Sequence, residues 1–113
     1  MQTTSRLLDE SGRITGILSL LGNKKRFQIM CHLLDGELSV GVIAEKVELS
    51  QSALSQHLAK LRSLRLVETR RDRQTIYYSC ASQEVRQLLE CCETIFFGAE
   101  AQPPRLKAVS GGR

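Results

Sequence analysis

Residues 50–64, SQSALSQHLAKLRSL, decide the fold prediction because they combine a helix cap, an apolar stripe and a polar face. Ser50 is a favourable N-cap and begins a helix predicted to run from Gln51 to about Ser63. Apolar side chains recur at helical spacing and are expected to face the core: Ala53, Leu54, Leu58 and Leu61. The other side chains are expected to point outward: Gln51, Ser52, Ser55, Gln56, His57 and Lys60.

This outward face has the chemistry of a helix that contacts DNA bases. Glutamine can pair with adenine through two hydrogen bonds, and serine can donate or accept at a base edge. The first turn of the helix also offers free backbone amides to a phosphate. A face that is only solvated usually carries Glu and Lys, whereas here Lys60 is the first charged residue. The pattern therefore favours DNA recognition over a merely solvated helix face.

The segments on either side of this helix complete a known arrangement. A short helix, Val40–Lys46, is predicted directly before it, capped by Ser39 and joined to it through a three-residue turn. After it, Leu66–Arg71 and Thr75–Ser79 are rich in Val, Thr, Ile and Tyr and predict two strands joined at a tip, Asp72–Gln74. Two short helices followed by a basic hairpin indicate a winged helix-turn-helix.

Positive charge is concentrated around this hairpin. The formal net charge of the chain is only +4, which many proteins without an anionic partner share. Six basic residues nevertheless fall close together, opposed in that stretch only by Glu68 and Asp72: Lys60, Arg62, Arg65, Arg70, Arg71 and Arg73. A local basic surface suits phosphates. The alternative is a winged-helix module that binds protein instead of DNA, and a steep salt dependence of binding would distinguish the two.

Three further helices are predicted outside this motif. The first runs from Thr4 to Leu21, the second is capped by Asn23 and extends to about Leu34, and the last is capped by Ser82. The second is expected to bury Phe27, Met30, Cys31 and Leu34. The fold class is therefore mainly α with a small β-hairpin (α+β), with about five helices and a two-stranded wing.

The first and last helices carry longer apolar stripes than so small a core can cover. We therefore expect them to form a homodimer interface, the alternative being ordinary packing within one chain. Residues 1–98 are predicted to form a DNA-binding and dimerisation domain. Residues 99–113 contain Pro-Pro and Gly-Gly pairs without periodicity and are predicted to be a disordered tail.

Several function classes lack their sequence signals. No targeting signal or membrane-length apolar run is present, so a cytoplasmic protein with reduced thiols and no membrane association is expected. There is no glycine-rich phosphate loop, no HExxH and no cluster of His with carboxylates, so neither catalysis nor a cofactor is expected.

The run from Asn23 to Tyr78 resembles the ArsR/SmtB family of bacterial repressors, most closely its metal-independent NolR-, HlyU- and BigR-like subgroup. The resemblance is carried by SQSALSQHLAKLR and by the RR-x-R-x-x-x-YY hairpin. It implies a homodimer built from the first and last helices, an inverted-repeat operator in double-stranded DNA, and repression by blocking polymerase. Five residues would enter the major groove: Gln51, Ser52, Ser55, Gln56 and His57. Five others would hold phosphates or the adjacent minor groove: Lys60, Arg62, Arg71, Arg73 and Gln74.

The sequence departs from the family pattern in two places. Where members often have Gly or Asn after the recognition helix, this chain has Arg65, which costs about 1 kcal/mol if the backbone there is left-handed. Metal-sensing members carry thiolates in a pattern like ELCVC, but the stretch here is ELSVG, with Ser39 and Gly41 at the ligand positions. A hydroxyl and a hydrogen cannot replace two thiolates, and the last helix has no His, so no metal site is expected.

The cysteines leave two interpretations open. Relatives that sense oxidants or reactive sulfur use one thiol at the position of Cys31 and a second late on the last helix, where Phe97 stands in this chain. In the first interpretation, Phe97 cannot form a bridge to Cys31, and Cys31 and Cys92 are small buried hydrophobes. Alternatively, the second thiol has moved to Cys91 or Cys92, and a bridge to Cys31 would release DNA.

Overall fold

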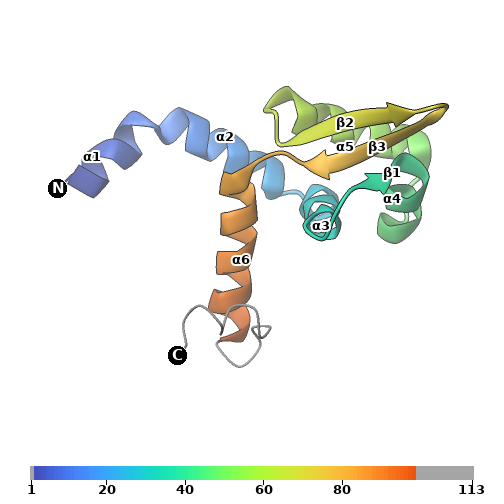
Figure 1. Cartoon of the computed structure of the whole chain (residues 1–113). Coiled ribbons are helices and arrows are strands. Elements are labelled where there is room, and N and C mark those ends of the chain that lie inside the picture. The colour runs from blue at the N-terminus through green and yellow to red at the C-terminus, as the bar shows by residue number, and fades with distance from the viewer. Residues whose placement is uncertain (1, 99–113) are drawn as a thin grey trace. The chain divides into compact units, whose positions relative to one another are not determined.

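The computed structural model describes residues 2–98, which form two units: one ends at Ala81 and the other begins at Ser82. The first unit holds five helices and a three-stranded sheet, and the second holds one helix (Figure 1). The elements of the first unit are α1 (Gln2–Asp9), α2 (Ser11–Leu21), α3 (Lys24–Leu33), β1 (Leu38–Ser39), α4 (Val40–Val47), α5 (Gln51–Ser63), β2 (Val67–Asp72) and β3 (Thr75–Cys80). The helix of the second unit is α6 (Gln83–Phe97). None of the described helices is long and apolar enough to cross a membrane.

The predicted winged helix-turn-helix is confirmed, and its helices begin where the sequence places their caps. The side chains of Asn23, Ser39, Ser50 and Ser82 each accept a hydrogen bond from a backbone N–H three residues later. Each bond satisfies a donor that the first helical turn leaves without an intrahelical partner. The caps therefore set the starts of α3, α4, α5 and α6.

The prediction of one helix from Thr4 to Leu21 is wrong in detail. The segment starts at Gln2 and divides at Glu10, whose backbone leaves helical geometry at φ −99° and ψ 12°. Glu10 N–H still donates to the Arg6 carbonyl, and Ile14 N–H to the Glu10 carbonyl, both at 3.0 Å. The hydrogen-bond ladder thus continues through the break between α1 and α2, and five predicted helices become six.

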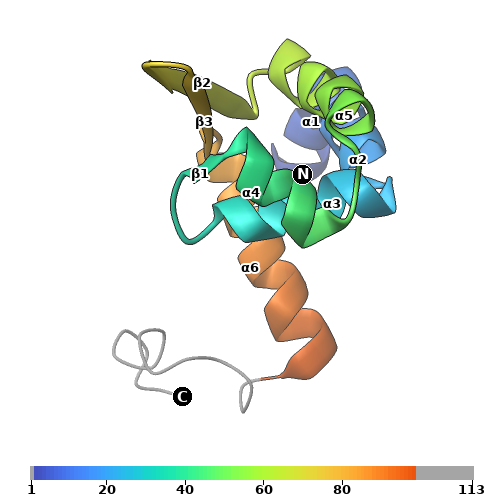
Figure 2. The same ribbon diagram turned by 90° about the vertical axis from the view of Figure 1, so that its right-hand side faces the viewer.

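The wing contains a strand that the sequence did not predict. β1 pairs with β3 through Leu38–Tyr78 and Ser39–Tyr77, which gives the antiparallel order β1-β3-β2. The predicted tip, Asp72–Gln74, is one residue shorter in the structure. Asp72 pairs with Thr75 at the ends of β2 and β3, so only Arg73 and Gln74 form the turn. Figure 2 shows the β2–β3 hairpin projecting from the helices of this unit.

The core of the first unit is aliphatic and centres on the helix-turn-helix. Leu54, Leu58 and Leu61 of α5 are buried as predicted, whereas Ala53 is half-buried. The buried face of α3 is rotated from the predicted one, because Ile29 and Leu33 are buried beside Met30. The other three residues predicted there are half-buried: Phe27, Cys31 and Leu34.

Arg65 adopts the left-handed conformation, with φ 60°. Its N–H donates to the Arg62 carbonyl at 2.9 Å, and Leu66 N–H donates to the Leu61 carbonyl at 3.0 Å. These two bonds form a Schellman motif, in which the left-handed residue is usually glycine. Leu61 and Leu66, the two positions between which an apolar contact often accompanies the motif, are both buried. The two backbone bonds set the direction in which the chain enters β2.

We expect Arg65→Gly to stabilise the fold by about 1 kcal/mol, because glycine adopts positive φ without a Cβ penalty. Denaturant unfolding of the full chain measures the change. Arg65→Ala is the matched control, since it removes the same charge but keeps the Cβ, and it should leave the stability nearly unchanged. Equal stabilisation by both variants would assign the effect to the lost charge instead of the backbone.

Candidate nucleic-acid interface

The polar face of α5 is largely exposed, as the sequence predicts. Five of its six outward residues are exposed, namely Gln51, Ser52, Ser55, Gln56 and Lys60. Because the buried leucines on the opposite side fix the rotation of the helix, this face is presented by a rigid element. It can contact base edges once the helix enters a major groove.

His57 differs from its neighbours because it is half-buried. A guanidinium nitrogen of Arg26, from α3, lies 3.4 Å from its Nδ1. The pKa of His57 is lowered, first by burial and then by the positive charges of Arg26, Lys60 and Lys25. His57 therefore lies against α3 with its neutral form favoured, which the spacing within α5 alone cannot reveal.

The tip of the wing carries the predicted basic residues on exposed positions, and Arg71, Arg73 and Gln74 are all exposed. Arg73 adopts positive φ, 62°, at the turn. The Arg71 guanidinium donates to the Arg73 carbonyl at 3.3 Å, so one basic side chain supports the backbone of the next. The tip thus presents a compact cationic group, as contact with phosphates requires.

Arg70 is paired, which changes the charge balance inferred from the sequence. Its Nε donates to both carboxylate oxygens of Glu37, at 3.1 and 3.2 Å, in the loop before β1. This bond lowers the pKa of Glu37. The guanidinium also lies 4.6 Å from the ring centroid of Tyr77, its cross-strand partner. Arg70 therefore ties the wing to the loop before β1. Within residues 2–98, neither Arg71 nor Arg73 has an acidic partner of this kind.

A groove of about 370 Å³ separates α5 from the wing. Its lining comes from α5 and from one residue of β3: Ser55, Ala59, Arg62, Ser63 and Tyr78. Tyr77 lies under Arg70 instead, so the two tyrosines occupy opposite faces of β3, as strand alternation predicts. Arg62, one of the predicted phosphate-binding residues, therefore stands at the junction of the helix and the wing.

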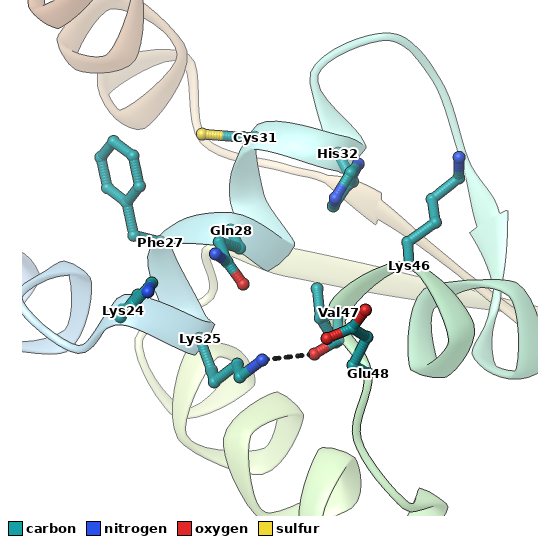
Figure 3. Close-up of a pocket in the computed structure, with 9 residues that line it drawn as sticks. All are labelled: Lys24, Lys25, Phe27, Gln28, Cys31, His32, Lys46, Val47 and Glu48. Carbon is teal, nitrogen blue, oxygen red and sulfur yellow. Dashed lines mark hydrogen bonds between the residues drawn. The ribbon is translucent and has the colours of Figure 1, made fainter.

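Lys25 connects the two helices that precede the recognition helix. Its Nζ donates to the Val47 carbonyl at the end of α4, at 2.6 Å (Figure 3). The bond lies in a pocket of about 400 Å³ between α3 and α4, which is also lined by Lys24, Lys46 and His32. It satisfies a carbonyl at a helix C-terminus, where cations are favoured. Lys25 thus helps to set the position of α4, and of the turn that leads into α5.

The four cysteines are in the thiol form, and none of them is in a disulfide. Cys31 is half-buried and lines the pocket of Figure 3, on a different side from the hydrogen bond between Lys25 and Val47. On α6, Cys91 is exposed and Cys92 is half-buried. Neither Cys31 nor Cys92 is fully buried, although the interpretation as small hydrophobes expected both to be. The pairing of Cys31 with Cys91 or Cys92 stays a prediction.

Comparison with known proteins identifies the family. Residues 23–69 match the family described as bacterial regulatory protein, arsR family. The transcriptional activator HlyU of Vibrio cholerae is 46% identical over 86 residues, which cover 76% of this chain and 80% of HlyU. The crystal structure of NolR from Sinorhizobium fredii is 49% identical with a TM-score of 0.75, covering 83% of this chain and 93% of NolR.

A third relative is an NMR structure from Mycobacterium bovis, the homodimeric winged helix-turn-helix DNA-binding domain Mb0332. It is 30% identical with a TM-score of 0.66, covering 84% of this chain and 85% of that one. The match to the family lies on the helix-turn-helix and the start of the wing, and the relatives extend it over most of the chain. The chain therefore belongs to the ArsR family of bacterial regulatory proteins.

Proposed function

We propose that this protein is a cytoplasmic transcriptional regulator that binds, as a homodimer, to an inverted repeat in double-stranded DNA. The observation that carries the proposal is the exposed polar face of α5, which is uncharged from Gln51 to Gln56, beside a basic wing tip. Side chains that fit base edges and cations that fit phosphates thus lie on neighbouring elements of one unit. This division between specificity and positioning is typical of sequence-specific DNA binding.

Exposed apolar side chains support the dimer. Leu7 and Leu8 of α1 are 54% and 69% exposed, and Leu18 of α2 is 48% exposed. On α6, the exposed fractions of Ile95, Phe96 and Phe97 are 69%, 75% and 67%. Clusters of large apolar residues at a surface mark interaction sites. A second copy of the chain is the proposed occupant, as in the homodimeric relative Mb0332.

The proposed regulatory effect is repression. A dimer bound across a promoter occupies DNA that RNA polymerase needs. Repression of this kind requires no surface on the protein that contacts the polymerase. HlyU, by contrast, is named an activator. A reporter fused to the regulated promoter distinguishes the two effects: loss of a repressor raises expression, and loss of an activator lowers it.

Selection from a pool of randomised duplexes tests the proposed binding mode. The enriched sequences should be pseudo-palindromes whose half-site centres lie about one helical turn apart, because a two-fold dimer presents its two α5 helices to successive major grooves. Titration of an enriched duplex should give two chains per site. Enrichment of sequences without two-fold symmetry, bound by a single chain, would contradict the proposal.

A further inference from the structure

The contact between Arg26 and His57 joins the recognition helix to α3 and has a definite chemical direction. Arginine has five N–H donors and no acceptor. The ring nitrogen that faces it, Nδ1 of His57 at 3.4 Å, must therefore use its lone pair. A neutral imidazole that accepts at Nδ1 carries its proton on Nε2.

The rest of the structure holds Arg26 in place for this contact. Its Nε donates to the Leu20 carbonyl at 2.8 Å, near the end of α2. Its backbone N–H donates to the capping oxygen of Asn23 at 3.1 Å. Arg26 is also half-buried. Its side chain is held by α2 and its backbone by the cap of α3, independently of its contact with α5.

The charges around His57 favour its neutral form. The groups that act on the ring are the cations Arg26, Lys60 and Lys25, and burial acts in the same direction. All four influences lower its pKa from an ordinary value near 6.5. Near neutral pH the ring therefore offers one N–H donor, and it does not add the non-specific charge of an imidazolium.

We propose that Arg26 is a positioning residue for DNA recognition: it fixes His57 as the Nε2–H tautomer, so that α5 presents a single directed donor to an acceptor on the DNA. This inference rests on the proposed DNA-binding function. Acceptors on the DNA are the N7 and O6 atoms of guanine, N7 of adenine, O4 of thymine, and phosphate oxygens. A donor on a base edge affects specificity, whereas a donor on phosphate affects all sequences alike.

The tautomer is measured without DNA. Two-bond ¹⁵N–¹H correlation spectra of the full chain at pH 7.5 should show the Nε2–H form of His57. Arg26→Ala should convert this signal to a mixture of both tautomers and raise the pKa of His57. Lys25→Ala is the matched control, because Lys25 is a nearby cation whose described bond is to Val47, and it should keep the Nε2–H form. An Nδ1–H or protonated His57 in the native protein would overturn the proposal.

Binding to DNA supplies the second arm. Arg26→Ala should reduce the preference for the enriched duplex over a shuffled one by about fourfold, because each of the two half-sites must select the Nε2–H form from a roughly equal mixture, at about twofold apiece. In a His57→Ala background the same change should have little further effect. An equal loss on both duplexes that persists without His57 would make Arg26 a plain phosphate contact and overturn the inference.

Two outcomes separate this inference from the proposed function. If the native protein shows the Nε2–H form but binds no duplex, the proposed DNA binding is refuted. The role of Arg26 in recognition is then refuted too, while the tautomer assignment stands. A protein that binds its duplex with His57 as Nδ1–H refutes only the role of Arg26. If Arg26→Ala does not fold, Arg26→Lys is measured instead. Lysine carries its donors on one nitrogen, whereas the Leu20 carbonyl and the His57 ring contact two different nitrogens of Arg26, so lysine should not reproduce both contacts and the Nε2–H fraction should again fall.

Discussion

Replacing Gln56 by alanine is expected to cost about 1–3 kcal/mol of binding free energy, but only on duplexes that carry its preferred base pair. Gln56 is exposed on α5, and its amide can make two hydrogen bonds to one base. Ser52→Ala should behave in the same way at a different position of the half-site. Competition binding against a set of duplexes with single base-pair changes measures both effects.

The wing residues should behave differently. Arg71→Ala and Arg73→Ala should weaken binding to every duplex alike, and each should reduce the salt slope by about one unit per lost phosphate contact. Arg70→Ala is the matched control on the same hairpin, since its charge already faces Glu37. It should change the slope less than either of the other two. If Gln56→Ala and Arg73→Ala gave the same profile across the duplex set, the division into base-contacting and phosphate-contacting residues would be wrong.

Leu58→Ala is expected to lower the free energy of unfolding by about 2–5 kcal/mol. Leu58 lies in the middle of α5 and is 2% exposed, so truncation removes buried methyl groups and leaves a cavity. Because the same packing fixes the rotation of α5, DNA affinity should fall as well, even though Leu58 is on the side opposite the polar face. Urea unfolding and duplex titration measure the two effects.

The matched control is Leu64→Ala, at the end of the same helix. Leu64 is 43% exposed, so its truncation should cost much less stability. If both variants lost the same stability, the burial of Leu58 would not be the cause of the loss, and helix propensity could not explain it either, because alanine is the better helix former. A stable Leu58→Ala variant with normal operator binding would contradict the account of how α5 is positioned.

The recognition helix was predictable because its signals are local. The Ser50 cap and the leucine spacing lie within one stretch of sequence, and they fix both the start of α5 and the face that it buries. The family resemblance predicted strain at Arg65 if its backbone were left-handed, and the structure shows that it is. Signals local in the sequence therefore predicted the start of α5 and the face that it buries.

The features that the sequence did not predict depend on contacts between distant residues. β1 has only two residues, too few for a periodic pattern, and exists because β3 pairs with it. Glu37 precedes its partner Arg70 by 33 positions, and Arg26 precedes His57 by 31. No spacing rule brings such pairs together. The charge balance of the wing and the half-buried state of His57 therefore became visible only in the folded chain.

The salt dependence of binding distinguishes sequence-specific DNA recognition from binding to a protein. The full chain is titrated with the enriched duplex and with a shuffled duplex of the same composition, between about 50 and 200 mM salt. Four cationic side chains per protomer are proposed to contact phosphate: Lys60, Arg62, Arg71 and Arg73. A dimer should then lose affinity by about 10³-fold or more over this range, while still preferring the enriched duplex. Equal and salt-independent affinity for both duplexes would rule out sequence-specific DNA binding and favour a winged-helix module that binds protein.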